Sequence, residues 1–133
     1  MHKTGLIFLA LFWFAGTAAA VELPMGTITP VVLSDTRTLV FSAYNHNPDC
    51  SVNEVPVARI TKRPATGEVE IEEGSGYSHY PKNSQLYECN TKQTLMSNIF
   101  YTSTKGFKGS DNFEIEVFSV GNSRKIRFRV TVR

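Results

Sequence analysis

Cys50 and Cys89 are the residues of this chain best suited to covalent chemistry. A redox site usually carries its pair as Cys-x-x-Cys, and the sequence has no such spacing. Both cysteines lie in polar segments, which predicts a structural disulfide that ties two long loops at one end of the domain. In the chain-entropy view, closing this loop adds on the order of 3–4 kcal/mol to the free energy of unfolding.

Two histidines beyond the N-terminal region, His46 and His79, could bind copper or zinc if a third ligand joined them. Met96 or a carboxylate could supply that ligand, since a bridged cysteine would not be available. The alternative is that both are ordinary surface histidines. The Gly-x-Ser-x-Gly motif of serine hydrolases is absent from the sequence. We therefore expect a non-catalytic protein without a cofactor or a bound metal.

The segment from Gly76 to Tyr87 combines tyrosines with Ser, Asn and Gly. This composition is typical of adaptable recognition loops. The candidate partner-binding residues in it are Tyr77, His79, Tyr80 and Tyr87. The alternative is that these side chains only cover the core beneath a long loop.

Charges along the whole chain are nearly balanced, with 14 Lys and Arg, 12 Asp and Glu, and a formal net charge of +2. This balance argues against a protein held on nucleic acid by charge. The C-terminal run is nevertheless rich in cations, namely Arg124, Lys125, Arg127, Arg129 and Arg133.

A hairpin that turns at Gly121 and Asn122 would neutralise part of this basic run. It places Glu116 opposite Arg127, and in the same register Glu114 opposite Arg129. We therefore expect a paired, solvated strand face rather than a nucleic-acid strip. A patch for an anionic ligand is the alternative.

Four glutamates lie close together at Glu68, Glu70, Glu72 and Glu73. Calcium sites converge carboxylates and carbonyls from a tight loop, whereas alternate residues of a straight strand are spread out. We expect a solvated strand face here rather than a calcium site, with Val69 and Ile71 turned to the opposite side.

The N-terminus has the features of a secretory signal peptide. Lys3 gives a positive start, an unbroken apolar run extends from Leu6 to Phe14, and small residues follow up to Ala20. A membrane-spanning helix needs about 20 apolar residues, so we predict a signal peptide at residues 1–20 and a mature domain at residues 21–133. An uncleaved anchor is the alternative. The mature domain would be exported, periplasmic or extracellular, and without a membrane span.

Apolar residues of the mature domain alternate with a period of two, which predicts an antiparallel sandwich or barrel. A connector at residues 63–67, with Pro64 and Gly67, predicts a hairpin of Val55–Lys62 with Glu68–Glu72. A short strand around Gln85–Glu88 is expected within the polar loop at residues 74–93. The other candidate strands are Thr27–Leu33, Thr38–Ala43, Met96–Tyr101, Asn112–Phe118 and Lys125–Val132.

The segment from Tyr101 to Val117 resembles the Y-x-P-x-x-G-F-x-G-x-D-x-F-x-Y-x-V signature of bacterial immunoglobulin-like, cadherin-like domains. Ile60 to Val69 resembles the V-x-x-x-P-x-x-G-x-V hairpin of the same family, and the resemblance covers roughly residues 27–132. It differs from the pattern at Ser103 and Ile115. The motif residues with expected structural roles are Tyr101, Gly106, Phe107, Gly109, Asp111 and Phe113.

This resemblance implies an immunoglobulin-like Greek-key sandwich of about seven antiparallel strands. Glycines at 106 and 109 would permit backbone shapes that a side chain forbids, and Phe107 and Phe113 would plug one end. Asp111 would bond nearby backbone amides. In related adhesin modules, aspartates near domain junctions can help to bind calcium.

Together these features predict an exported, non-catalytic binding or structural module, associated with the cell envelope or surface. The expected partner is another protein or a cell-surface component, and not nucleic acid; the oligomeric state stays open. A periplasmic inhibitor or accessory subunit of a partner enzyme is the alternative. A small metal carrier that uses His46 and His79 is a third hypothesis.

Overall fold

A computed structural model describes Gly16 and residues 25–133 of the chain. The predicted signal peptide at residues 1–20 lies outside the described residues, apart from Gly16. No helix of the described part is long and apolar enough to cross a membrane. Its elements are β1 (Met25–Ile28), β2 (Val31–Val32), β3 (Thr38–Ala43), β4 (Asn45–His46), β5 (Val52–Glu54), β6 (Val57–Lys62), β7 (Gly67–Tyr77), the 3-10 helix η1 (Tyr87–Thr91), β8 (Gln93–Ser103), β9 (Gly109–Ser119) and β10 (Asn122–Val132).

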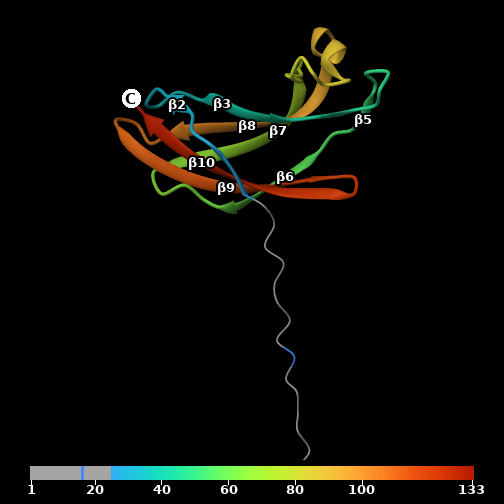
Figure 1. Ribbon diagram of the computed structural model, residues 1–133. Coiled ribbons are helices and arrows are strands. Elements are labelled where there is room, and N and C mark those ends of the chain that lie inside the picture. Colours follow the sequence, from blue (N-terminus) through green and yellow to red (C-terminus); the bar gives the residue numbers. More distant parts are fainter. Residues whose placement is uncertain (1–15, 17–24) are drawn as a thin grey trace, which may run out of the picture.

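The strands form a sandwich of two layers, with β3, β8 and β7 facing β10, β9 and β6 (Figure 1). One sheet has the order β1-β10-β9-β6, with β2 also paired to β10, and the other has the order β3-β8-β7. β4 and β5 form a separate two-stranded sheet. Strands that are not consecutive lie side by side, as β3 does beside β8 and β6 beside β9, which is Greek-key connectivity. Seven of the described strands have four or more residues. The all-β sandwich predicted from the sequence is confirmed.

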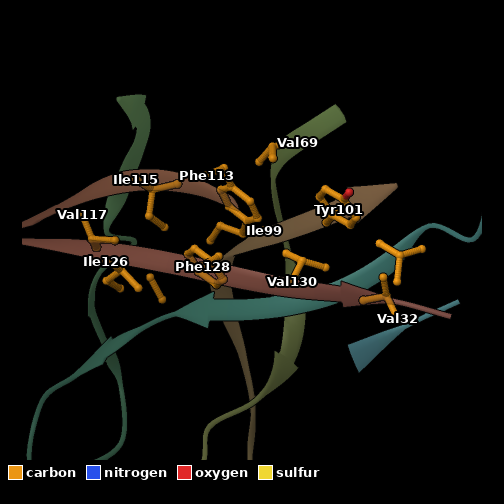
Figure 2. Packing of buried hydrophobic residues seen from close by; sticks show 12 residues of the cluster. Val32, Val69, Ile99, Tyr101, Phe113, Ile115, Val117, Ile126, Phe128 and Val130 are labelled. Carbon is orange, nitrogen blue, oxygen red and sulfur yellow. The ribbon is translucent and has the colours of Figure 1, made fainter. Parts of the chain in front are cut away.

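The core lies between the two sheets and is built from alternate residues of the long strands (Figure 2). Ile99, Tyr101, Phe113, Ile115 and Phe128 are fully buried. The rings of Phe113 and Phe128 stack with their centroids 4.3 Å apart, and Phe113 also stacks on Tyr101 at 5.9 Å. Burial of each large side chain of this kind stabilises the fold by about 1.5–3 kcal/mol. These rings therefore join β8 of one sheet to β9 and β10 of the other.

The first predicted strand is divided into β1 and β2 at Pro30. Proline has no N–H to donate to a ladder. Both pieces run parallel to β10, whereas the other strand pairs are antiparallel. The Pro30 carbonyl accepts a hydrogen bond of 2.9 Å from the Thr131 amide. The edge of the sheet thus stays attached across the break.

The predicted hairpin of Val55–Lys62 with Glu68–Glu72 is wrong, because β6 and β7 belong to different sheets. β6 pairs with β9, whereas β7 pairs with β8. The connector at residues 63–67 crosses from one sheet to the other. A proline and a glycine show that the chain bends, but they do not show whether it returns to the same sheet or crosses to the next.

The hairpin of β9 and β10 exists as predicted, but its register differs by two residues. Ser119 pairs with Asn122, so the turn residues are Val120 and Gly121. Gly121 has a φ of +70°, and glycine takes such an angle freely at the second position of the turn. A shift of two keeps each side chain on its face, and so Phe128 stays in the core as expected.

The shift of register changes the charge pairs of this hairpin. Arg127 lies opposite Glu114, and Arg129 lies opposite Asn112. The predicted pairs Glu116–Arg127 and Glu114–Arg129 are therefore wrong. Glu116 instead forms an ion pair with Arg59 of β6.

The strand predicted at Glu68–Glu72 continues to Tyr77, so the loop after it is shorter than expected. Gly74 and Gly76 belong to the strand, where they pair with Met96 and Thr94 of β8. A Cβ at Gly76 would be 2.9 Å from the sulfur of Met96, and a strand glycine often marks such a close approach. The short strand expected around Gln85–Glu88 is wrong, since turns and η1 occupy that segment.

Candidate functional site

A groove of about 550 Å³ opens at one end of the sandwich, between the end of β3, the β9–β10 turn and the loop that follows β7. Apolar side chains form part of its lining, namely Phe41, Tyr44, Pro56, Tyr80, Pro81 and Leu86. Polar groups come from Ser42, Asn45, His79, Ser119, Asn122, Ser123 and Arg124. Such a mixture of rings with a few polar groups is typical of sites that bind a ligand or a polypeptide segment.

The loop at residues 78–91, which forms one wall of this groove, is fastened by the side chain of Asn90. Its Oδ1 atom accepts hydrogen bonds from Ser78 Oγ at 3.0 Å and from the Tyr80 amide at 2.8 Å. Its Nδ2 atom donates to the Tyr80 carbonyl at 2.9 Å. These bonds satisfy backbone groups that no strand partner reaches, and they fix the position of Tyr80.

The ring of Tyr80, in this loop, packs together with the rings of Tyr44 and His46. The ring centroids of Tyr44 and Tyr80 are 5.2 Å apart, and those of His46 and Tyr80 are 5.6 Å apart. The Nδ1 atom of His46 lies 3.0 Å from the Tyr80 hydroxyl oxygen. His46 is only 6% exposed, and this burial lowers the pKa of its imidazole. Burial and the neighbouring Tyr44 raise the pKa of the Tyr80 hydroxyl.

A disulfide between Cys50 and Cys89 closes this end of the molecule, as predicted from the sequence. Cys50 ends the turn after β4, with a φ of +66°, and Cys89 is buried within η1. The bridge therefore connects the β4–β5 hairpin to the loop at residues 78–91. A link of this kind removes freedom from the unfolded chain and keeps the two loops together in the folded one.

The β9–β10 turn, on the other side of the groove, is held by the carboxylate of Glu54. Its Oε1 atom accepts hydrogen bonds from Ser119 Oγ at 2.6 Å and from the Val120 amide. These bonds lower the pKa of Glu54. Arg124 lies nearby with its guanidinium carbon 5.7 Å from the centre of the Phe41 ring. The groove thus has a cation at its rim and fixed walls on both sides.

Two of the four predicted loop residues, His79 and Tyr80, line the groove. Tyr80 is half-buried in the ring cluster, and the amide of His79 donates a 2.8 Å hydrogen bond to the Tyr44 hydroxyl. Tyr77 ends β7 and Tyr87 begins η1. Both are exposed and do not line the groove. The role of all four as partner-binding residues stays a prediction.

The chain matches no protein-family model and no curated protein. The likeness to bacterial immunoglobulin-like, cadherin-like domains therefore stays a prediction, which is based on the motif residues of the sequence.

Asp111, the motif aspartate, lies at the opposite end of β9 and is 4% exposed. Its carboxylate accepts five hydrogen bonds, from the amides of Ala65, Thr66 and Asn112, from Thr66 Oγ1 and from the Tyr101 hydroxyl. Burial raises the pKa of Asp111, but the hydrogen bonds outweigh it and the pKa lies below its ordinary value. The expected bonds to backbone amides are present, and they extend to the β6–β7 connector.

The other motif residues have structural positions in the β8–β9 loop, at the start of β9 and in the core. Gly106 and Gly109 have φ angles of +82° and +134°, so both take backbone shapes that a side chain disfavours. Phe107 packs against the core, and Phe113 lies in its centre. Tyr101 is fully buried, and burial together with the Asp111 charge raises the pKa of its hydroxyl.

Within residues 25–133, no group of three or more His, Cys, Asp or Glu side chains could hold a metal ion. The strand glutamates are spread out as expected, and two of them bind a cation of their own chain. Arg37 lies 2.8 Å from Glu70 and 2.8 Å from Glu72, with its guanidinium carbon 3.5 Å from the centre of the Phe100 ring. The five hydrogen bonds to Asp111 already occupy its oxygens.

The sequence did not single out Phe41, Tyr44 or Asn90 as site residues, and it marked Arg124 only as a member of the C-terminal basic run. Tyr44 lies between β3 and β4, two positions before His46 at the end of β4, and this spacing in an extended segment was a weak signal that the two share a face. Asn90 follows a cysteine directly, and nothing in its sequence context distinguishes it from an ordinary loop amide. These residues meet only because the disulfide and the sandwich bring distant segments together.

Proposed function

We propose that the protein is an exported, non-catalytic binding module of immunoglobulin-like fold that recognises another protein through the groove end of its sandwich. The observation that carries this proposal is a groove of about 550 Å³ with fixed walls on both sides. The disulfide, Asn90 and the ring cluster hold one wall, and Glu54 holds the other. Because these loops are already ordered, binding loses little conformational entropy.

The lining indicates which kind of partner segment fits. Phe41, Tyr80 and Leu86 offer apolar surface for one inserted side chain, while Asn122 and Ser123 at the start of β10 offer hydrogen bonds to its backbone. Arg124 at the rim favours an acidic residue beside that side chain. A loop of a partner protein that carries an apolar residue next to an aspartate or glutamate satisfies all of these groups.

Site-specific photo-crosslinking in the producing cells tests this proposal. A photoreactive residue replaces Leu86 at the groove, and in a control chain it replaces the exposed Lys105, which lies in the β8–β9 loop at the opposite end. We expect one discrete protein adduct from position 86, and none from position 105. We also expect the adduct to disappear when Tyr80→Ala is added. Absence of an adduct at position 86, or the same adducts at both positions, would contradict the proposal.

A further inference from the structure

The outer face of the sheet that contains β6, β9 and β10 is strongly basic. Lys125, Arg127 and Arg129 alternate with the buried residues of β10 and therefore point away from the core. The register with β9 adds Arg59 and Lys62 of β6 to the same face, beside Glu114 and Glu116. The five cations and two carboxylates of these strands give the face a net charge of +3.

Both carboxylates on this face are already engaged. Glu114 lies 2.8 Å from Arg127, and Glu116 lies 3.2 Å from Arg59. Arg129 faces the neutral side chain of Asn112 across the ladder. Among the residues that the structure describes, no ion pair involves Lys62, Lys125 or Arg129. The sheet therefore presents uncompensated positive charge on a rigid surface.

A hollow of about 400 Å³ lies at one end of this face. Its walls carry the side chains of Lys62, Arg127 and Arg129, together with the hydroxyls of Ser110 and Thr131 and the amide of Asn112. The nearby Asp111 carboxylate is turned inward, where Tyr101 and the β6–β7 connector occupy its oxygens. The hollow is thus surrounded by cationic, hydroxyl and amide donors, which are the groups that bind phosphate oxygens.

We propose that this hollow binds an oxyanion of the phosphate type, either free in solution or at a phospholipid headgroup. The site is distinct from the groove, because its β9 residues are Ser110 to Asn112 whereas those of the groove are Val117 and Ser119. The proposal rests on the register of β9 and β10, which leaves Arg129 without a carboxylate opposite. It does not depend on the proposed function of the groove.

Two probes distinguish the possible sources of the phosphate. Pyrophosphate is titrated into the ¹⁵N-labelled protein at low ionic strength, and binding to vesicles of phosphatidylglycerol is compared with binding to vesicles of phosphatidylcholine. We expect saturable shifts of the amide signals around Lys62, Asn112 and Arg129 for a free anion. Binding to phosphatidylglycerol vesicles alone identifies the lipid source.

Matched variants separate a specific site from general attraction by net charge. Arg129→Gln and Lys62→Gln each weaken binding of the responding probe about tenfold, since each removes charged hydrogen bonds. Lys82→Gln removes the same charge from an exposed loop position at the groove end and leaves binding unchanged. The amide spectra of the variants report directly that they are folded. Absence of binding to both probes, or equal losses in Arg129→Gln and Lys82→Gln, would overturn the proposal.

Discussion

The two ends of the sandwich close the space between the sheets in different ways. At one end the buried Asp111 carboxylate accepts five hydrogen bonds and ties the β6–β7 connector to β8 and β9. At the other end the disulfide, Asn90 and three aromatic rings hold a loop outside the core, and a groove remains. This comparison shows two ways to close a sandwich. The buried polar network occupies the space at its end, whereas the linked loops are held in place and leave an open groove beside them.

Removal of the carboxylate at the Asp111 end is the largest expected effect. Asp111→Ala leaves the Tyr101 hydroxyl, the Thr66 hydroxyl and three backbone amides without their acceptor. We expect it to lower the free energy of unfolding by about 3–5 kcal/mol. Denaturant unfolding measures this loss. Asp49→Ala is the matched control at the groove end, because Asp49 is exposed and bonds only to Ser51 nearby. Equal losses for both variants would remove the distinction between the two ends.

The same carboxylate predicts the response of the protein to acid. Its pKa is lowered by hydrogen bonds in the folded state, so its stabilising contribution is present above the unfolded pKa of about 3.9 and is lost as the pH falls through the folded value.

Loss of the disulfide is the next effect in size. The double variant Cys50→Ser, Cys89→Ser lowers the free energy of unfolding by about 3–4 kcal/mol in the chain-entropy view. We also expect hydrogen exchange to rise first in residues 78–91, with β9 and β10 still protected, since the core does not include the bridge. Loss of protection in β9 and β10 before the loop would show that the two ends are not independent.

Two tyrosines allow the two ends to be compared by removal of a single hydroxyl group at each end. Tyr101→Phe removes a buried hydrogen bond to a charged group and costs about 1.5–3 kcal/mol. Tyr80→Phe removes a neutral hydrogen bond to His46 and costs about 0.5–1.5 kcal/mol. Both losses are measured by denaturant unfolding. A larger cost at Tyr80 would contradict the assignment of the structural role to the Asp111 end.

The smallest expected effect is a pH dependence confined to the groove end. Burial lowers the pKa of His46 in the folded protein, so the unfolded chain binds the proton more readily, and stability falls as the pH drops below the unfolded pKa of about 6.5. Thermal unfolding across this range, compared with His46→Phe, isolates the contribution. His79→Gln, a change at an exposed loop position, retains the dependence. A slope that persists in His46→Phe and disappears in His79→Gln would contradict this origin.

Several parts of the fold were predictable because they depend on local patterns. Alternating apolar residues predict β3, β9 and β10, and two cysteines in polar segments predict the bridge. The sheet to which β7 belongs was not predictable from its connector. In the structure β7 pairs with β8, and the Asp111 carboxylate holds the connector by accepting hydrogen bonds from Ala65 and Thr66, far away in the sequence.

The site was predictable only in part for the same reason. Tyr80 and His79 stand out by composition, but Tyr44 and Phe41 join them through the path of β3, and Arg124 joins through the β9–β10 turn. The register of that turn depends on whether Gly121, which has a positive φ, occupies the first or the second central position of the turn. An error of two residues there kept every side chain on its predicted face of the sheet and yet changed Arg129 from a paired to an unpaired cation.

The most direct test of the account is the affinity of the protein for the partner identified by crosslinking at position 86. Isothermal titration compares the wild type with Arg124→Glu at the groove and with Lys105→Glu at the opposite end, which carries the same change of charge. The account predicts that Arg124→Glu weakens binding about tenfold or more and that Lys105→Glu leaves it unchanged. Equal weakening by the two variants, or weakening by Lys105→Glu alone, would contradict the claim that the groove end is the recognition surface.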